Sequence, residues 1–90
     1  MEKPQRSFSA QTADGVGGID VFEDRITLRL GKRARDVKKG YVESITKKGS
    51  LALGKVEAEL AYYDMLGSRE TVTFAIHDSE FRALKSILGK

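Results

Sequence analysis

The stretch from Lys55 to Leu88 reads KVEAELAYYDMLGSRETVTFAIHDSEFRALKSIL, and the spacing of its apolar residues indicates two kinds of element. From Lys55 to Tyr63 and again from Thr71 to His77, apolar side chains alternate with polar ones, which is the period of a half-buried strand. An Asp, a Gly and a Ser lie between the two runs, and these residue types favour turns. We therefore predict a long antiparallel hairpin in this part of the chain.

The residues after His77 follow a helical period instead. Four apolar residues lie at helical spacing on one stripe: Phe81, Leu84, Ile87 and Leu88. Asp78 or Ser79 is a suitable N-terminal cap, and Gly89 suits the C-terminal end of a helix. We predict a helix over residues 78–88 whose apolar stripe packs on the strands.

Shorter alternating runs precede this stretch. Phe8 and Ala10 indicate a first strand, and the run 25–30 places its apolar residues on one face, which is typical of a strand. The intervening segment 14–18 contains three glycines and has the composition of a hairpin turn. The sequence therefore predicts a second hairpin in the first third of the chain.

Two middle segments are less regular. Residues 31–40 are charged and bounded by glycines, which favours an exposed connection, although 34–37 could instead extend a strand. Residues 41–46 contain good strand formers that do not alternate cleanly, so we predict a bulge or an edge strand there.

Together these elements predict a mainly β fold: an antiparallel sandwich or partly open barrel of six or seven strands, capped by one C-terminal helix. Residues 1–6 read as a flexible leader and residues 7–90 as a single domain. The chain has 90 residues, no Cys and a single His, which argues against tetrahedral zinc sites, thiolate chemistry and a Ser/Cys-His mechanism, and we expect no metal or cofactor. We expect a cytoplasmic protein, because no apolar run approaches a membrane span or a signal peptide. We also expect that it is not an enzyme, because the sequence offers no catalytic constellation.

This order of elements resembles the pleckstrin-homology-like superfold, including the GRAM domains and small bacterial and archaeal members. The resemblance rests on GIDVFEDRITL (18–28) as part of a tight hairpin, on VESI (42–45), on the hairpin from Val56 to Ile76, and on the helix from Asp78 to Leu88. Lipid-binding members carry Lys and Arg around the first hairpin loop, whereas residues 14–20 contain none. The resemblance therefore implies a protein-interaction adaptor rather than a phosphoinositide-binding domain.

Charge along the sequence is uneven. Residues 25–48 hold nine basic and two acidic side chains, a local charge of +7, and the remaining residues sum to −4. The candidate partner-binding residues in this segment are Arg29, Lys32, Arg33, Arg35, Lys38, Lys39, Lys47 and Lys48. We expect them to bind an acidic protein partner, with nucleic acid or anionic membrane lipid as the alternative. The competing interpretation is that they are solvated strand ends and loops that protect sheet edges.

Four apolar residues lie in predicted connections: Leu51, Leu53, Met65 and Leu66. They form a candidate protein interface or homo-oligomer contact. The interpretation that we favour is a small satellite core beneath the loops. The single His77 ends a strand and is predicted to be structural.

Overall fold

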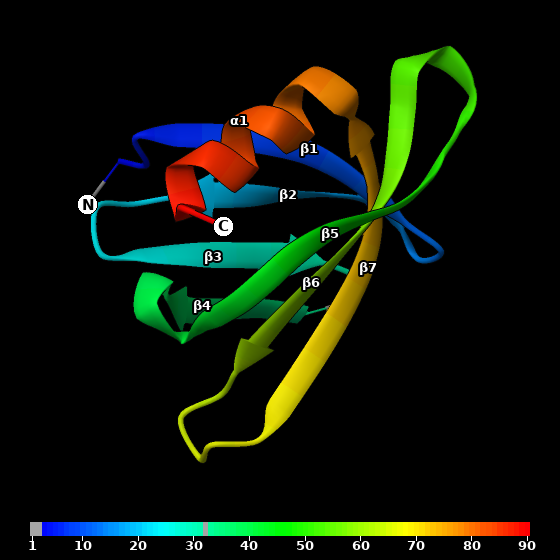
Figure 1. The fold of residues 1–90 in the computed structure, drawn as a ribbon. Helices are drawn as coiled ribbons and strands as arrows, with labels where there is room; N and C mark the ends of the chain where they lie inside the picture. The colour runs from blue at the N-terminus through cyan, green and yellow to red at the C-terminus, as the bar shows by residue number, and fades with distance from the viewer. Residues whose placement is uncertain (1–2, 32) are drawn as a thin grey trace.

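A computed structural model describes residues 3–31 and 33–90 as an antiparallel sheet followed by one helix (Figure 1). The strands are β1 (Arg6–Thr12), β2 (Gly15–Val21), β3 (Arg25–Leu30), β4 (Arg33–Lys38), β5 (Val42–Ser50), β6 (Lys55–Tyr63) and β7 (Arg69–His77). Two short 3-10 turns, η1 (Lys39–Tyr41) and η2 (Ala52–Gly54), flank β5, and helix α1 (Asp78–Leu88) ends the chain. The mainly β fold class with a C-terminal helix is confirmed.

The seven strands form one sheet in the order β4-β3-β2-β1-β7-β6-β5. Two halves, β1 to β4 and β5 to β7, run in different directions and meet where Gln11 of β1 lies opposite Ala75 of β7 (Figure 1). Within the described residues no ladder joins β4 to β5, so the sheet is bent but not closed into a barrel. The partly open form of the prediction is therefore the correct one.

The core lies between the two halves and beneath the helix. Phe8, Ile19 and Leu28 come from the first half, whereas Leu60 and Phe74 come from the second, and all five are buried. Helix α1 packs against β6 and β7 and adds three buried side chains: Phe81, Leu84 and Leu88. Ile87 lies on the predicted apolar stripe but is 36% exposed, so the buried stripe is narrower than predicted.

The glycine-rich segment is a strand rather than a turn. The β1–β2 connection is the two-residue loop Ala13–Asp14, and Gly17 and Gly18 lie within β2, opposite Ala10 and Ser9. A Cβ on Gly17 would lie 2.0 Å from the carbonyl oxygen of Arg29. Gly17 is therefore explained by the close approach of β2 to β3 and not by turn geometry.

The charged segment after Gly31 is also a strand. β4 pairs antiparallel with β3, with Arg35 opposite Leu28 and Val37 opposite Ile26. The predicted exposed connection is therefore wrong, and the alternative strand extension is right, because β3 offers β4 a ladder of backbone partners. The predicted edge and bulge in the next strand are confirmed, since β5 is the other edge and shifts register twice.

Both ends of the chain differ in detail from the prediction. β1 begins at Arg6, and the Gln5 amide donates to the Val21 carbonyl, so pairing reaches into the expected leader, whose first two residues lie outside the described part. The N-cap of α1 is His77, with no side-chain capping hydrogen bond, in place of Asp78 or Ser79. Gly89 ends the helix in the left-handed conformation, as predicted. Among the described residues, no helix has the length and apolar content needed to span a bilayer.

Candidate partner-binding surfaces

The predicted basic residues do not form one surface. Arg29 lies on β3 and donates from Nε and Nη2 to both carboxylate oxygens of Asp20, at 2.7 and 2.9 Å. Lys32 and the side chain of Arg33 lie outside the described part of the chain. Arg35 is directed into a pocket described below. Of these four residues, Arg29 therefore belongs to an ion pair and Arg35 to a pocket.

The Arg29–Asp20 pair is a bidentate ion pair on the sheet surface. Hydrogen bonds from Arg29 hold the pKa of Asp20 below its ordinary value, with partial burial acting in the opposite direction and a 2.8 Å bond from Ser7 adding to the shift. The same hydrogen bonds raise the pKa of the Arg29 guanidinium. Because its charge is neutralised by Asp20, Arg29 is a weak candidate for binding an acidic partner.

The other predicted cations diverge along η1 and β5. The ammonium of Lys38 lies 5.9 Å from the centre of the Tyr41 ring, and Lys39 is half-buried. Lys47 reaches Asp78 of α1 at 3.8 Å, whereas Lys48 reaches Glu59 of β6 at 3.7 Å. Lys47 therefore belongs to the helix face, and Lys48 belongs to the outer face of the β5–β6 hairpin.

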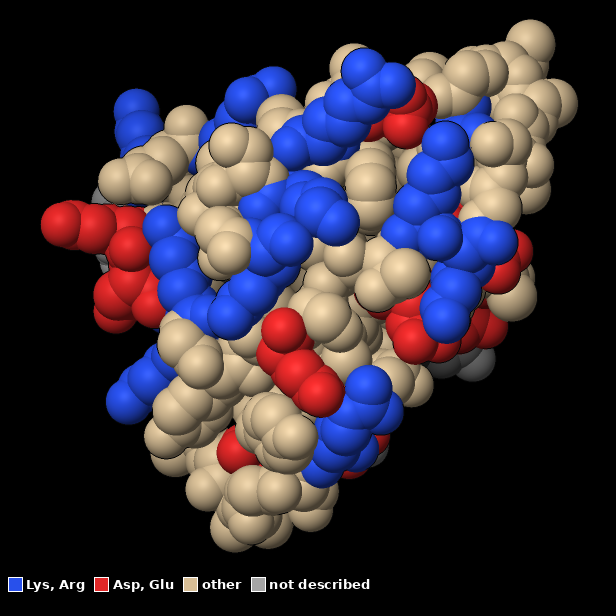
Figure 2. Space-filling model, viewed as in Figure 1, with Lys and Arg blue, Asp and Glu red and all other residues tan. Residues whose placement is uncertain are grey.

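A second basic cluster, which the sequence analysis did not select, lies at the C-terminal end of α1. We call it the basic hollow. It is an open depression of about 460 Å³ lined by Arg82, Lys85, Ser86, Gly89 and Lys90. Lys and Arg side chains gather over α1 and β5 on this face (Figure 2). The sequence does place Arg82 and Lys85 together on the outward side of the predicted helix. Asp78 and Glu80 nearby bring the net charge of this segment close to zero, so a count of local charge does not reveal the cluster.

Charge in the basic hollow is only partly neutralised. Arg82 donates to Asp78 at 2.7 Å, one turn back along the helix. Lys85 and Lys90 have no carboxylate within 4.0 Å in the part of the chain that the structure describes. Both lie near the helix C-terminus, whose carbonyl groups carry partial negative charge and favour cations there. The hollow therefore presents two ammonium groups whose only compensation among the described residues is the partial charge of the helix end.

The four candidate interface residues are separated into two pairs. Leu51 and Leu53 lie at the β5–β6 connection, whereas Met65 and Leu66 lie at the β6–β7 turn, at the opposite end of β6 (Figure 1). Leu53, Met65 and Leu66 are 89%, 91% and 91% exposed. The favoured interpretation of a satellite core is therefore wrong for Leu53, Met65 and Leu66, which the described chain leaves almost fully exposed, whereas Leu51 is 44% exposed and partly covered.

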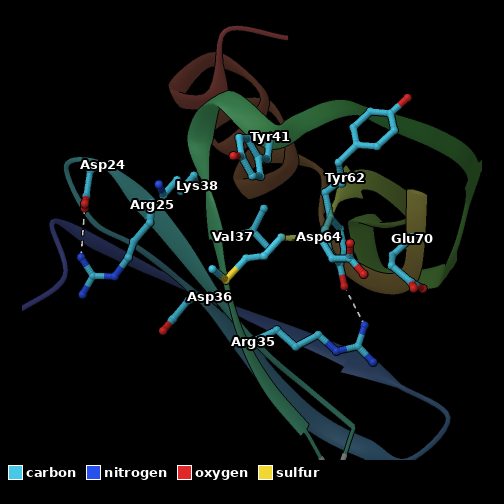
Figure 3. Close-up of a pocket in the computed structure, with 12 residues that line it drawn as sticks. Asp24, Arg25, Arg35, Asp36, Val37, Lys38, Tyr41, Tyr62, Asp64 and Glu70 are labelled. Carbon is cyan, nitrogen blue, oxygen red and sulfur yellow. Dashed lines mark hydrogen bonds and ion pairs between the residues drawn. The ribbon is translucent and has the colours of Figure 1, made fainter. Parts of the chain in front are cut away.

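A pocket of about 500 Å³ lies in the opening between the edge strand β4 and the β6–β7 turn, and we call it the seam pocket (Figure 3). One wall consists of Asp24, Arg25, Arg35, Asp36, Val37 and Lys38. The other consists of Tyr41, Tyr62, Tyr63, Asp64, Met65 and Glu70. Arg35 reaches from β4 toward Tyr62 at one end, and Tyr41 stands at the other end (Figure 3). Its volume is within the range of ligand-binding clefts.

Most charged groups of the seam pocket already have partners. Asp24 accepts from Arg25 at 2.9 Å, and Asp36 accepts from the Thr27 hydroxyl at 2.6 Å. Asp64 accepts from the backbone amides of Leu66 and Ser68, which fixes the turn. Arg35 differs, because its half-buried guanidinium donates to the neutral Tyr62 hydroxyl at 2.6 Å and has no carboxylate partner among the described residues.

Comparisons with known proteins add no family to this picture. No protein-family model matches the chain, and no curated protein matches it. Within residues 3–31 and 33–90, no group of three or more His, Asp or Glu side chains is arranged to hold a metal ion. The chemistry of the two surfaces is therefore the basis for assigning a function.

Proposed function

We propose that this chain is a non-catalytic adaptor domain, similar to the pleckstrin-homology-like superfold, whose basic helical face binds an acidic segment of a partner protein. The observation that carries the proposal is that Arg82, Lys85 and Lys90 line one hollow without any acidic residue among its lining. A carboxylate-rich segment bound there would form charge-assisted hydrogen bonds with ammonium groups that have no carboxylate partner among the described residues. Lys47, which shares Asp78 with Arg82, extends the same face toward β5.

Two features favour an acidic protein over the other anionic partners. Among the residues that the structure describes, no aromatic residue lines the basic hollow, whereas sites for single-stranded nucleic acid stack bases on aromatic rings. The exposed large apolar residue of α1 is Ile87, which offers little surface for insertion into a lipid interface. The fold part of the proposal is supported by the order of seven antiparallel strands followed by one helix.

The test is a titration of isotopically labelled protein, followed by NMR, with four probes at low and moderate salt: a decaglutamate peptide, a short DNA duplex, a DNA single strand and phosphatidylserine vesicles. We expect saturable shifts from decaglutamate at residues 82–90. The double variant Lys85→Gln/Lys90→Gln should weaken binding about tenfold. Lys3→Gln/Lys55→Gln, which removes the same charge elsewhere, should weaken it much less.

Each other outcome overturns part of the proposal. Equal weakening by both double variants would mean that net charge alone attracts the peptide. Tighter binding of DNA or vesicles through residues 82–90 would mean that the partner is nucleic acid or anionic lipid and not an acidic protein. Absence of shifts with every probe would identify the basic hollow as a solvated surface.

A further inference from the structure

The seam pocket is independent of the basic hollow, and one of its walls is the exposed edge of a strand. β4 stands at the end of the sheet order, with β3 on one side and no strand on the other among the described residues. Four consecutive residues of this strand, Arg35–Lys38, line the pocket. Since an edge strand leaves alternate backbone N–H and C=O groups without ladder partners, this wall offers main-chain hydrogen bonds to an extended chain.

The side chains of the pocket define what such a chain would carry. Arg35 lies opposite the buried Leu28, so its side chain is on the core face of β4. Its guanidinium uses Nη1 for Tyr62 and has further donors in a planar fork. A carboxylate on a bound segment would neutralise a half-buried charge that has no carboxylate partner in the part of the chain described.

Aromatic side chains supply the apolar part of the pocket. The residues Tyr41 and Tyr63 are 43% and 40% exposed, and Met65 at the neighbouring turn is almost fully exposed. Tyrosine rings and a flexible thioether are typical of surfaces that receive an apolar side chain. The buried Val37 forms the base of this region.

Glu70 limits how acidic the bound segment can be. It lies opposite Tyr62 in the β6–β7 register and lines the pocket without an ion pair in the described chain. A run of acidic residues would be repelled by Glu70, whereas one acidic residue placed at Arg35 would not. The pocket therefore differs in its preference from the basic hollow, which favours many carboxylates.

We propose that the seam pocket binds an extended peptide segment of a partner protein, which pairs with the β4 edge, places a single Asp or Glu side chain on Arg35 and packs an apolar side chain beside Tyr41.

The test is to pan a displayed library of random short peptides against the intact domain and to titrate the enriched peptide into labelled protein. We expect a consensus with one acidic residue beside an apolar one. Amide shifts should cluster at residues 35–38 and 62–65. N-methylation of every second peptide amide should abolish binding when the methylated amides face the β4 edge and spare binding when they face away from it. This difference is expected for strand pairing.

Variants separate this proposal from the previous one. Arg35→Gln should weaken the enriched peptide at least tenfold, whereas Arg29→Gln, which removes a charge outside the pocket, should change it less than twofold. Lys85→Gln/Lys90→Gln should leave binding intact. Enrichment of polyacidic peptides that shift residues 82–90 would overturn the seam proposal and favour the basic hollow. Failure to enrich any peptide, or an Arg35-independent consensus, would identify Arg35 as an edge-protecting charge only.

Discussion

The guanidinium of Arg35 on β4 donates a 2.6 Å hydrogen bond to the hydroxyl of Tyr62 on β6, and this bond spans the opening between the two halves of the sheet. Tyr62 is buried and belongs to the core, whereas Arg35 occupies a core-facing position on an edge strand. A charged side chain at such a position cannot be sealed in an apolar interior without a large desolvation penalty. The pair therefore marks the place where the core ends and the sheet stays open.

The first prediction concerns this bond. Tyr62→Phe keeps the buried ring but removes the acceptor for Arg35, and we expect a loss of about 1 kcal/mol in the free energy of unfolding in urea. Tyr63→Phe is the matched control. It removes a hydroxyl that has no hydrogen bond within the described chain, so its cost should be within about 0.5 kcal/mol of zero. Equal costs for the two variants would mean that the hydrogen bond contributes nothing to stability.

The second prediction concerns the pH dependence of the Arg29–Asp20 pair. The pKa of Asp20 is lowered in the folded state, so the carboxylate contributes stability above its unfolded pKa of about 3.9 and loses it as the pH falls through the folded value. The stability difference between the wild type and Asp20→Asn should be constant above about pH 5 and shrink in more acidic solution. Because Arg29 is half exposed, the difference should be below about 1 kcal/mol.

The control for this pair is the same substitution in an Arg29→Gln background. There the effect of Asp20→Asn should be smaller and nearly independent of pH, since the largest cause of the shift is gone. The pKa of Asp20, followed by NMR of its carboxyl carbon, should rise toward the ordinary value in Arg29→Gln. A stability difference between the wild type and Asp20→Asn that grows as the pH falls would contradict a lowered pKa of Asp20.

The third prediction concerns Gly17. Its Cβ in Gly17→Ala would lie 2.0 Å from the Arg29 carbonyl oxygen, which is backbone held in the β2–β3 ladder and cannot move aside. We expect a loss of about 1–3 kcal/mol, as for overpacked interiors. Gly49→Ala is the control, because no atom of the described residues beyond its two chain neighbours lies within 4 Å of its added Cβ, and it should be neutral or slightly stabilising. Urea unfolding of both variants gives the comparison, and a neutral Gly17→Ala would mean that β2 and β3 are not this close.

The sequence predicts those elements whose local pattern and tertiary environment agree. The β6–β7 hairpin and α1 match their predicted bounds closely because alternating or helical spacing continues through each of them. The turn predicted at Gly17 and Gly18 is wrong because glycine suits a turn and also a close strand contact, and only the neighbour, Arg29, decides between the two. β4 was ambiguous because its core-facing Arg35 breaks the apolar alternation.

The candidate sites depend more on tertiary structure than the strands do. Closeness in sequence suggested one basic surface over residues 25–48, but the fold places Arg29 on Asp20, Arg35 in the seam pocket and Lys47 beside α1. The seam pocket combines residues from β4 with residues from the β6–β7 turn, more than 20 positions later. No local pattern predicts this combination, because it follows from the angle at which the two halves meet.

The last prediction tests how α1 is attached. Leu84 is fully buried and Ile87 is 36% exposed, although both belong to the same apolar stripe of the sequence. Leu84→Ala should cost about 2–5 kcal/mol, which is a large part of the stability of a domain this small, whereas Ile87→Ala should cost less than about 1 kcal/mol. Urea unfolding followed by circular dichroism measures both, and Leu84→Val keeps the comparison measurable if Leu84→Ala does not fold. The basic hollow is held in place by this packing, so decaglutamate binding should survive Ile87→Ala and weaken in Leu84→Ala or Leu84→Val as the helix detaches. Equal stability losses at the two positions would mean that α1 packs on the sheet in a different rotation from the one described.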